Sequence, residues 1–193
     1  MKRVALFGGT FDPIHRGHVF IASRAREHCR LDELVFIPCW LSPHKQDQEP
    51  PTDGDHRLRM IELAIQDLPW ASVSSWELNR SQASFSWQTA EHFRRGMDKS
   101  DELFWIIGMD QWKVIERWGR IDYLSTLVEF IVFPRNGQSP TPKDSIPARF
   151  LDDAMDISST KIRTQQAQGL SIANEVTPAV ADYMIEKALY QAS

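Results

Sequence analysis

The chain has 193 residues, 42% hydrophobic and 25% charged, which is ordinary for one globular domain spanning residues 1–193. Its formal net charge of −4 and the lack of basic aromatic clusters argue against a nucleic-acid-binding protein. The apolar runs are too short to cross a bilayer, which takes ~20 residues. We therefore expect a cytoplasmic protein without nucleic-acid or membrane partners, with Cys29 and Cys39 as reduced thiols.

The charges are distributed unevenly along the chain. Up to Lys45 the sequence has seven cations and four anions, for a net charge of +3, whereas the remainder carries −7. Four of the six histidines also lie in this first part. A locally basic segment in an acidic protein favours a single site for a small polyanionic ligand.

Short apolar runs alternate with amphipathic segments from the N-terminus onward, which is typical of alternating strands and helices. The predicted elements, in chain order, are a strand at 3–7, a helix from about residue 17, a strand at 33–38, a polar loop at 42–55, a helix at 56–68 capped by Asp55, a strand at 71–78, a helix at 86–96, strands at 103–107 and 128–133, a loop at 135–147, and helices at 159–168 and 178–189.

Strands that alternate with helices form right-handed βαβ units and a parallel sheet. We therefore predict a Rossmann-like α/β fold with a parallel sheet of five or six strands and helices on both faces. Ligands of such sheets bind at the carboxyl ends of the strands, near the switch in strand order, where the first strand normally lies. The stretch FGGTFDPIHRGH, at residues 7–18, leaves the first strand at that place.

This stretch combines backbone freedom with two titratable rings. Gly8 and Gly9 are expected to turn the backbone sharply and to admit a phosphate, although the spacing is neither GxGxxG nor GxxxxGK[ST]. His15 and His18 are spaced i, i+3 at the start of a predicted helix, where N–H groups and the helix dipole favour an anion. Two imidazoles there can donate hydrogen bonds to a phosphate whose charge grows in a transition state. The alternative is that either ring is only a structural cap.

GGTFDPIHRGH also carries an (H/T)xGH signature and in this resembles the nucleotidyltransferase α/β phosphodiesterase superfamily. Further motifs, in the same order, resemble the nicotinate-mononucleotide adenylyltransferase family. These are PHK ending at Lys45, HRLRMIELAI at 56–65, FWIIGMD at 104–110, Trp118, FIVFPR ending at Arg135, and ISSTKIR at 157–163.

The resemblance implies an adenylyl transfer in NAD biosynthesis. The 5′-phosphate of nicotinate mononucleotide attacks the α-phosphorus of ATP in line, without a covalent enzyme intermediate, and deamido-NAD and pyrophosphate leave. The partners are then ATP and a pyridine mononucleotide, and Mg²⁺ is carried on the ATP phosphates without a metal site of the protein's own, as magnesium often is.

The resemblance also assigns roles to individual residues. Those implied in catalysis are His15, His18, Lys45 and Arg163. Those implied in ATP binding are Gly8, Gly9, Phe11, His18, Gly108, Asp110, Ile157, Ser158, Ser159 and Arg163. Those implied in mononucleotide binding are Thr10, Phe85, Ser86, Trp118 and Arg135.

One segment departs from the family pattern. Where the family has a sequence close to SYTxDTL, this chain has SFSWQTA at residues 84–90, with Phe85 in place of tyrosine and Gln88 in place of a carboxylate. The choice between nicotinate and nicotinamide mononucleotide therefore stays open, as does the oligomeric state. A catalytically weak, regulatory nucleotide-binding homologue is a further alternative.

Overall fold

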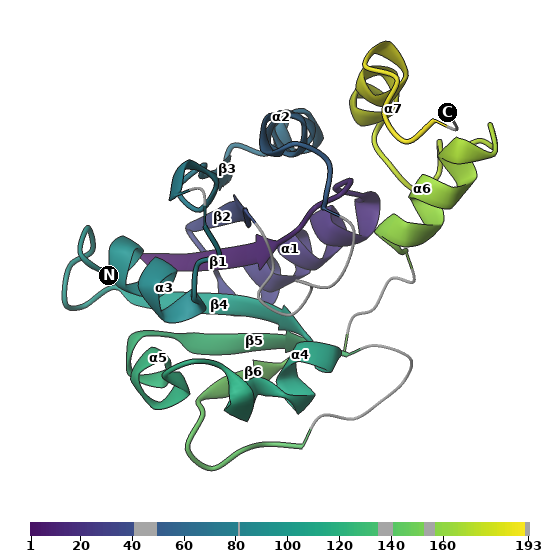
Figure 1. Ribbon diagram of the computed structural model, residues 1–193. Helices are drawn as coiled ribbons and strands as arrows, with labels where there is room; N and C mark the ends of the chain where they lie inside the picture. Colours follow the sequence, from purple (N-terminus) through teal and green to yellow (C-terminus); the bar gives the residue numbers. More distant parts are fainter. Residues whose placement is uncertain (41–49, 81, 135–140, 153–156, 192–193) are drawn as a thin grey trace.

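The computed structural model describes residues 1–40, 50–80, 82–134, 141–152 and 157–191 (Figure 1). In these ranges the strands are β1 (Arg3–Gly9), β2 (Glu33–Pro38), β3 (Ala71–Val73), β4 (Glu102–Gly108), β5 (Glu129–Phe133) and β6 (Ala148–Phe150). The helices are α1 (Arg16–Cys29), α2 (Gly54–Ile65), α3 (Ser86–Arg94), α4 (Met109–Lys113), α5 (Ile121–Leu127), α6 (Ser159–Ala167) and α7 (Pro178–Glu186), with 3₁₀ turns η1 (Leu78–Arg80) and η2 (Ile115–Arg117).

All six strands belong to one parallel sheet in the order β3-β2-β1-β4-β5-β6. The chain builds one half of the sheet outward from β1 and then returns to add β4 on its other side. The switch in strand order therefore lies between β1 and β4, and both strands end there in glycine. The predicted Rossmann-like α/β fold is confirmed.

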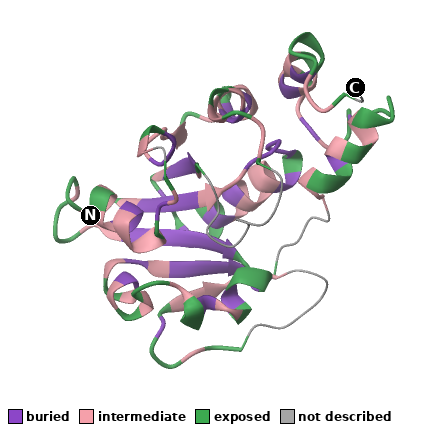
Figure 2. Ribbon diagram, in the orientation of Figure 1, coloured by how far each residue is buried: buried purple, intermediate pink, exposed green. Residues whose placement is uncertain are grey.

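The sheet is buried on both faces, as Figure 2 shows by the purple of its central strands. Alternate residues of β1 point to opposite sides, so that Ala5 and Phe7 join one core while Val4 and Leu6 join the other. The first core receives side chains from α1, α2, α6 and α7, and the second from α3, α4 and α5. Helices thus cover both faces, as predicted.

Three local predictions are corrected, and one strand was missed. Strand β1 continues through Gly9, so the predicted turn at the glycines is wrong. Strand β3 stops at Val73, and residues 74–77 leave the sheet and lead into η1, which begins at Leu78. Helix α2 begins at Gly54, and its cap is Asp53, whose carboxylate accepts the Asp55 N–H at 2.9 Å; the predicted cap Asp55 is itself helical. Strand β6 was not located, because three residues give no readable alternation.

The two glycines leave room for aromatic side chains at the carboxyl end of β1. A Cβ atom on Gly9 would lie 2.9 Å from the ring of Phe11, and one on Gly8 would lie 3.3 Å from the indole of Trp105. Phe11 is only 3% exposed and has a left-handed φ of 50°. Gly9 therefore leaves the space into which the Phe11 ring folds back over the end of β1.

Substituting Gly9 with alanine is expected to destabilise the protein by about 1–3 kcal/mol, because overpacking against a buried ring forces a backbone shift. Gly108→Ala is the matched control, since nothing lies within 4 Å of its Cβ position. Urea unfolding of both variants measures the difference. A Gly9→Ala protein as stable as Gly108→Ala would contradict this role of Gly9.

Candidate active site

The candidate site lies at the carboxyl ends of β1 and β4, beside the first turns of α1 and α6 (Figure 1). Thr10 and Phe11 directly follow β1, His15 is the N-cap of α1, and His18 is the third residue of that helix. Gly108 ends β4 and caps α4, with Asp110 exposed in the first turn. The fold therefore brings together residues that the sequence places more than ninety positions apart.

His15 and His18 cap each other's backbone. The Nδ1 atom of His15 accepts the main-chain N–H of His18, and the Nδ1 atom of His18 accepts the main-chain N–H of His15, both at 3.3 Å. The two rings stack with centroids 3.7 Å apart and an interplanar angle of 19°. The structural-cap role is therefore real, and it holds the two imidazoles in register.

This capping also decides where the ring protons lie. A nitrogen that accepts a backbone N–H carries no proton, so each neutral ring has its proton on Nε2. Burial, helped by the adjacent His15 ring, holds the pKa of His18 well below its ordinary value, and this ring is neutral at pH 7. The pair thus presents N–H donors at Nε2 and is suited to stabilising negative charge.

Aromatic side chains of the core pack against the His18 ring. The Phe11 ring meets the imidazole edge to face at a centroid distance of 5.0 Å, and the Phe7 ring does so at 5.9 Å. Phe36 from β2 packs against both phenylalanines. These contacts come from the core itself, so the orientation of His18 is tied to the packing of the sheet.

Helix α6 docks against the segment between β1 and α1. Ser159 donates its hydroxyl to the Pro13 carbonyl at 3.0 Å, and Arg163 donates from Nη1 to the Asp12 carbonyl at 2.7 Å. Ile157 packs next to Gly17, with its Cβ 3.4 Å from where a Gly17 side chain would begin. Ser158 is the N-cap of α6. The ISSTKIR motif is therefore adjacent to the histidine motif.

Asp12, in the same segment, is buried, and its carboxylate accepts hydrogen bonds from two distant parts of the chain. Its Oδ1 accepts the Tyr190 hydroxyl at 2.6 Å, and its Oδ2 accepts the Thr52 main-chain N–H at 3.3 Å. Burial and the Asp12 carboxylate raise the pKa of Tyr190 above its ordinary value, so the phenol remains a donor. The end of the chain thus secures the loop before the histidines, which no sequence motif indicated.

Three of the residues implied in mononucleotide binding, Phe85, Ser86 and Trp118, form a second group. Phe85, 49% exposed, is the N-cap of α3, with Ser86 next to it. The Phe85 ring lies 3.3 Å from the Cβ position of Gly119, directly after Trp118. The Trp118 indole is half-buried and meets Phe130 edge to face. Lys45 and Arg135, the remaining predicted residues, lie outside the described residues.

Two polar side chains around α3 form hydrogen bonds within the protein. Gln88, which replaces the family's carboxylate, accepts the Phe85 main-chain N–H through Oε1 at 3.1 Å. Glu77, only 6% exposed, accepts the Thr89 hydroxyl at 2.6 Å. Burial raises the pKa of Glu77 to about 7, although the Thr89 hydrogen bond and Arg80 act in the opposite direction. Glu77 therefore anchors the helix that begins with Ser86.

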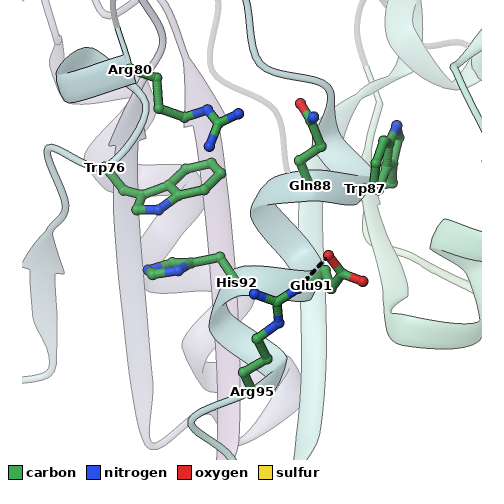
Figure 3. Close-up of a pocket in the computed structure, with 7 residues that line it drawn as sticks. All are labelled: Trp76, Arg80, Trp87, Gln88, Glu91, His92 and Arg95. Carbon is green, nitrogen blue, oxygen red and sulfur yellow. Dashed lines mark hydrogen bonds and ion pairs between the residues drawn. The ribbon is translucent and has the colours of Figure 1, made fainter.

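A separate hollow of about 300 Å³ opens between α3 and the segment at residues 76–80 (Figure 3). In it the Arg80 guanidinium lies over one face of the Trp76 indole, and the His92 ring stacks on the other face. Glu91 and Arg95 form an ion pair at its rim. Among its lining residues none is assigned to either substrate, and the Trp76 faces are already covered.

The parallel sheet and its switch point define an α/β protein of the nucleotide-binding type, and the histidine pair lies where such folds bind their ligand. The sequence profile of the cytidylyltransferase-like family matches residues 6–165, and the chain belongs to this family. The predicted nucleotidyltransferase is thereby confirmed.

Solved structures of similar fold include two of the Plasmodium falciparum nicotinic acid mononucleotide adenylyltransferase, one complexed with APC and one with NaAD. Their TM-scores are 0.79 and 0.80, each at 18% identity over 98% of both chains. A putative nicotinate-nucleotide adenylyltransferase from Vibrio parahaemolyticus has a TM-score of 0.74 at 18% identity, over 100% of this chain and 98% of that one.

The described ranges hold neither a membrane-spanning helix nor a cluster of metal ligands. They contain no helix with the length and apolarity needed to cross a membrane. Within the same ranges, no three His, Cys, Asp or Glu side chains are grouped so as to hold a metal ion.

Glu77→Gln is expected to remove a pH dependence of stability. Because the folded-state pKa is raised from 4.5 to about 7, unfolding releases a proton in this window, and wild-type stability falls as pH rises through it. The variant keeps an acceptor for Thr89 and should be more stable than wild type at pH 8, by at most about 3 kcal/mol. Urea unfolding at pH 5 and pH 8 measures this.

Glu62→Gln serves as control, since Glu62 is half-exposed and pairs only with its helix neighbour Arg59 in the described contacts. Identical pH profiles for wild type and Glu77→Gln would show that the Glu77 carboxyl is ionised normally in the folded protein.

Proposed function

We propose that the protein is a nicotinate-mononucleotide adenylyltransferase that converts ATP and nicotinate mononucleotide into deamido-NAD and pyrophosphate. The observation that carries the proposal is the mutually capped pair His15 and His18, with Nε2–H donors at the carboxyl end of β1 and ISSTKIR docked beside them. The printed names of the solved relatives, which include this activity, lend support.

In the proposed reaction an oxygen of the mononucleotide 5′-phosphate attacks the α-phosphorus of ATP. The bond from that phosphorus to the oxygen bridging to the β-phosphate breaks in line, and pyrophosphate leaves with the electron pair. Such transfers depend on positioning and on stabilising the charge of the transition state. The Nε2–H groups of His15 and His18 supply donors for the α-phosphate and the bridging oxygen, and donors of this kind are strongest where water is excluded.

The other ATP contacts follow the same logic. The N–H groups at Ser158 and Ser159, at the start of α6, and the Arg163 guanidinium suit the β- and γ-phosphates. Gly108 leaves open space at the end of β4, and Asp110 offers a carboxylate to ribose hydroxyls. Mg²⁺ enters as part of the MgATP substrate, and Lys45 belongs to the same proposal through the PHK motif alone.

The pyridine end is assigned to Phe85, Ser86 and Trp118, with Thr10 nearer the phosphate and Arg135 taken from the motif alone. A flat, electron-poor ring stacks well on indole. Because the Gln88 side chain is occupied by the cap of α3, selection between acid and amide rests on the N–H groups of this turn. Nicotinamide mononucleotide is the alternative substrate, and a weakly catalytic regulatory homologue is the alternative protein.

A pyrophosphate-release assay tests the proposal directly. Purified protein with MgATP should release pyrophosphate when nicotinate mononucleotide is added, and more slowly with nicotinamide mononucleotide. Faster turnover of the nicotinamide compound would establish the alternative substrate. Absence of release with either mononucleotide, in a protein that binds ATP, would leave the regulatory homologue as the correct description.

Two substitutions of His18 separate its capping from its donor role. Asparagine places an acceptor where Nδ1 lies, so His18→Asn should retain the cap and the melting temperature but lose kcat by roughly 10²–10³-fold. Glutamine places an N–H donor near Nε2 but loses the acceptor, so His18→Gln should keep more kcat and melt at a lower temperature. Steady-state kinetics and thermal unfolding give both quantities. The reverse pattern would refute the donor assignment.

A further inference from the structure

We propose that Arg57, in the first turns of α2, is a positioning residue that holds the loop carrying the histidine pair. It does not contact substrate in this account; it acts through the backbone of three segments that converge behind the site. The activity part of this inference rests on the proposed function, whereas its structural part can be tested without any turnover.

Arg57 is the most deeply buried charged side chain among the described residues, at 1% exposure. Its Nε donates to the carbonyl of Thr52 at 2.7 Å, and its Nη1 donates to the carbonyls of Thr10 and Cys39, both at 2.8 Å. One rigid guanidinium thus joins three main-chain segments that are distant in sequence.

The choice of residue is unusual on energetic grounds. Removing a guanidinium from water costs several kcal/mol, and a buried cation is ordinarily compensated by a carboxylate. In the described residues Arg57 has no ion pair, and its recorded partners are main-chain carbonyls. An apolar side chain of similar volume would fill the same space at lower cost. An arginine is explained at this position by the three carbonyl groups, because one guanidinium donates to all of them.

Each carbonyl belongs to a segment that supports the site. Thr10 is the first residue after β1 and begins the segment that leads to His15. Cys39 directly follows β2, and its N–H donates to the Gly9 carbonyl at 2.9 Å. Thr52 donates its own N–H to Oδ2 of Asp12. Arg57 therefore contacts the segment at Thr10 directly and at Asp12 through Thr52.

The remaining attachments of that segment lie on its other side. Tyr190 donates to the Asp12 carboxylate, and Arg163 donates to the Asp12 carbonyl. With Arg57 gone, these would hold Asp12, while Thr10 would keep, among its described contacts, only the weak contact of its hydroxyl with the Cys39 thiol at 3.8 Å. A displacement of about 1 Å in a reacting group can cost 10²-fold in rate, so the loss should be seen mainly in kcat.

Lysine should not replace Arg57. An ammonium on a flexible stem has its donors around one nitrogen, whereas the guanidinium fork spans acceptors in fixed directions. Arg57→Lys retains the charge and most of the stem, which makes it the informative variant. Arg59→Lys is the matched control, because Arg59 lies on the same helix but is exposed and pairs with Glu62 at 2.8 Å.

The first test is kinetic and is made at a temperature well below the unfolding of each variant. Arg57→Lys should reduce kcat for pyrophosphate release by roughly 10–10²-fold, with the KM for ATP changed far less, while Arg59→Lys resembles wild type. A lower melting temperature for Arg57→Lys with unchanged kcat would show that the residue only stabilises the fold, and would overturn the proposal.

The second test needs no activity and therefore separates this inference from the proposed function. Amide hydrogen exchange in Arg57→Lys should be faster across residues 10–18 and unchanged across α3. Equal acceleration in both regions, or none at residues 10–18, would overturn the proposal. If wild type released no pyrophosphate, the proposed function would fail while this exchange result still decided the role of Arg57.

A third measurement uses wild type and so does not depend on a variant that folds. In ¹⁵N spectra of the arginine side chains, a non-hydrolysable ATP analogue should shift the Nε–H signal of Arg57 but not that of Arg59. An Arg57 signal that stays fixed at saturating analogue would contradict the proposed link between this side chain and the site.

Discussion

The candidate site depends on the reciprocal hydrogen bonds by which His15 and His18 cap the start of α1. Each ring uses its Nδ1 atom to satisfy the main-chain N–H of the other residue at the start of α1. Capping and catalysis are usually assigned to different side chains, whereas the function proposed above gives both roles to one pair. Because each Nδ1 atom accepts a backbone N–H at the start of the helix, the ring proton lies on Nε2. The same hydrogen bonds that begin α1 therefore leave Nε2–H donors facing the candidate site.

The other parts of the site hold this pair in place. The phenylalanines that support His18 belong to the core of the sheet, so the imidazole is oriented by packing. Helix α6, Tyr190 and Arg57 attach to the preceding loop through its carbonyls and the Asp12 carboxylate. Rigid positioning of this kind is what an in-line phosphoryl-type transfer requires, since little covalent chemistry is left to the protein.

Features with a strong local pattern could be predicted from the sequence. The apolar runs of β1, β2, β4 and β5 predicted the sheet, and the histidine spacing predicted the position at the start of α1 where the candidate site is placed. The glycines were misread, because their role is to make room for Phe11 and Trp105, and these contacts are visible only in three dimensions. The short helices α4 and α5 have too few turns for a helical period to emerge.

The residues behind the site were missed for different reasons. Arg57 could have been noticed in the sequence, because it lies on the same helical face as Met60 and Ile61, where an apolar residue is expected. Glu77 lay within an apparently alternating strand, so its burial had no local signal. Tyr190 contacts a residue 178 positions away, and no spacing rule connects them.

The most direct test of this account is the protonation of the two imidazoles in the free protein. Long-range ¹H–¹⁵N correlation spectra of ¹⁵N-histidine-labelled protein at pH 7 distinguish the two neutral tautomers and the cation. We predict that His15 and His18 both carry their proton on Nε2 before any substrate binds. A proton on Nδ1 of either ring, or a cationic His18, would contradict it.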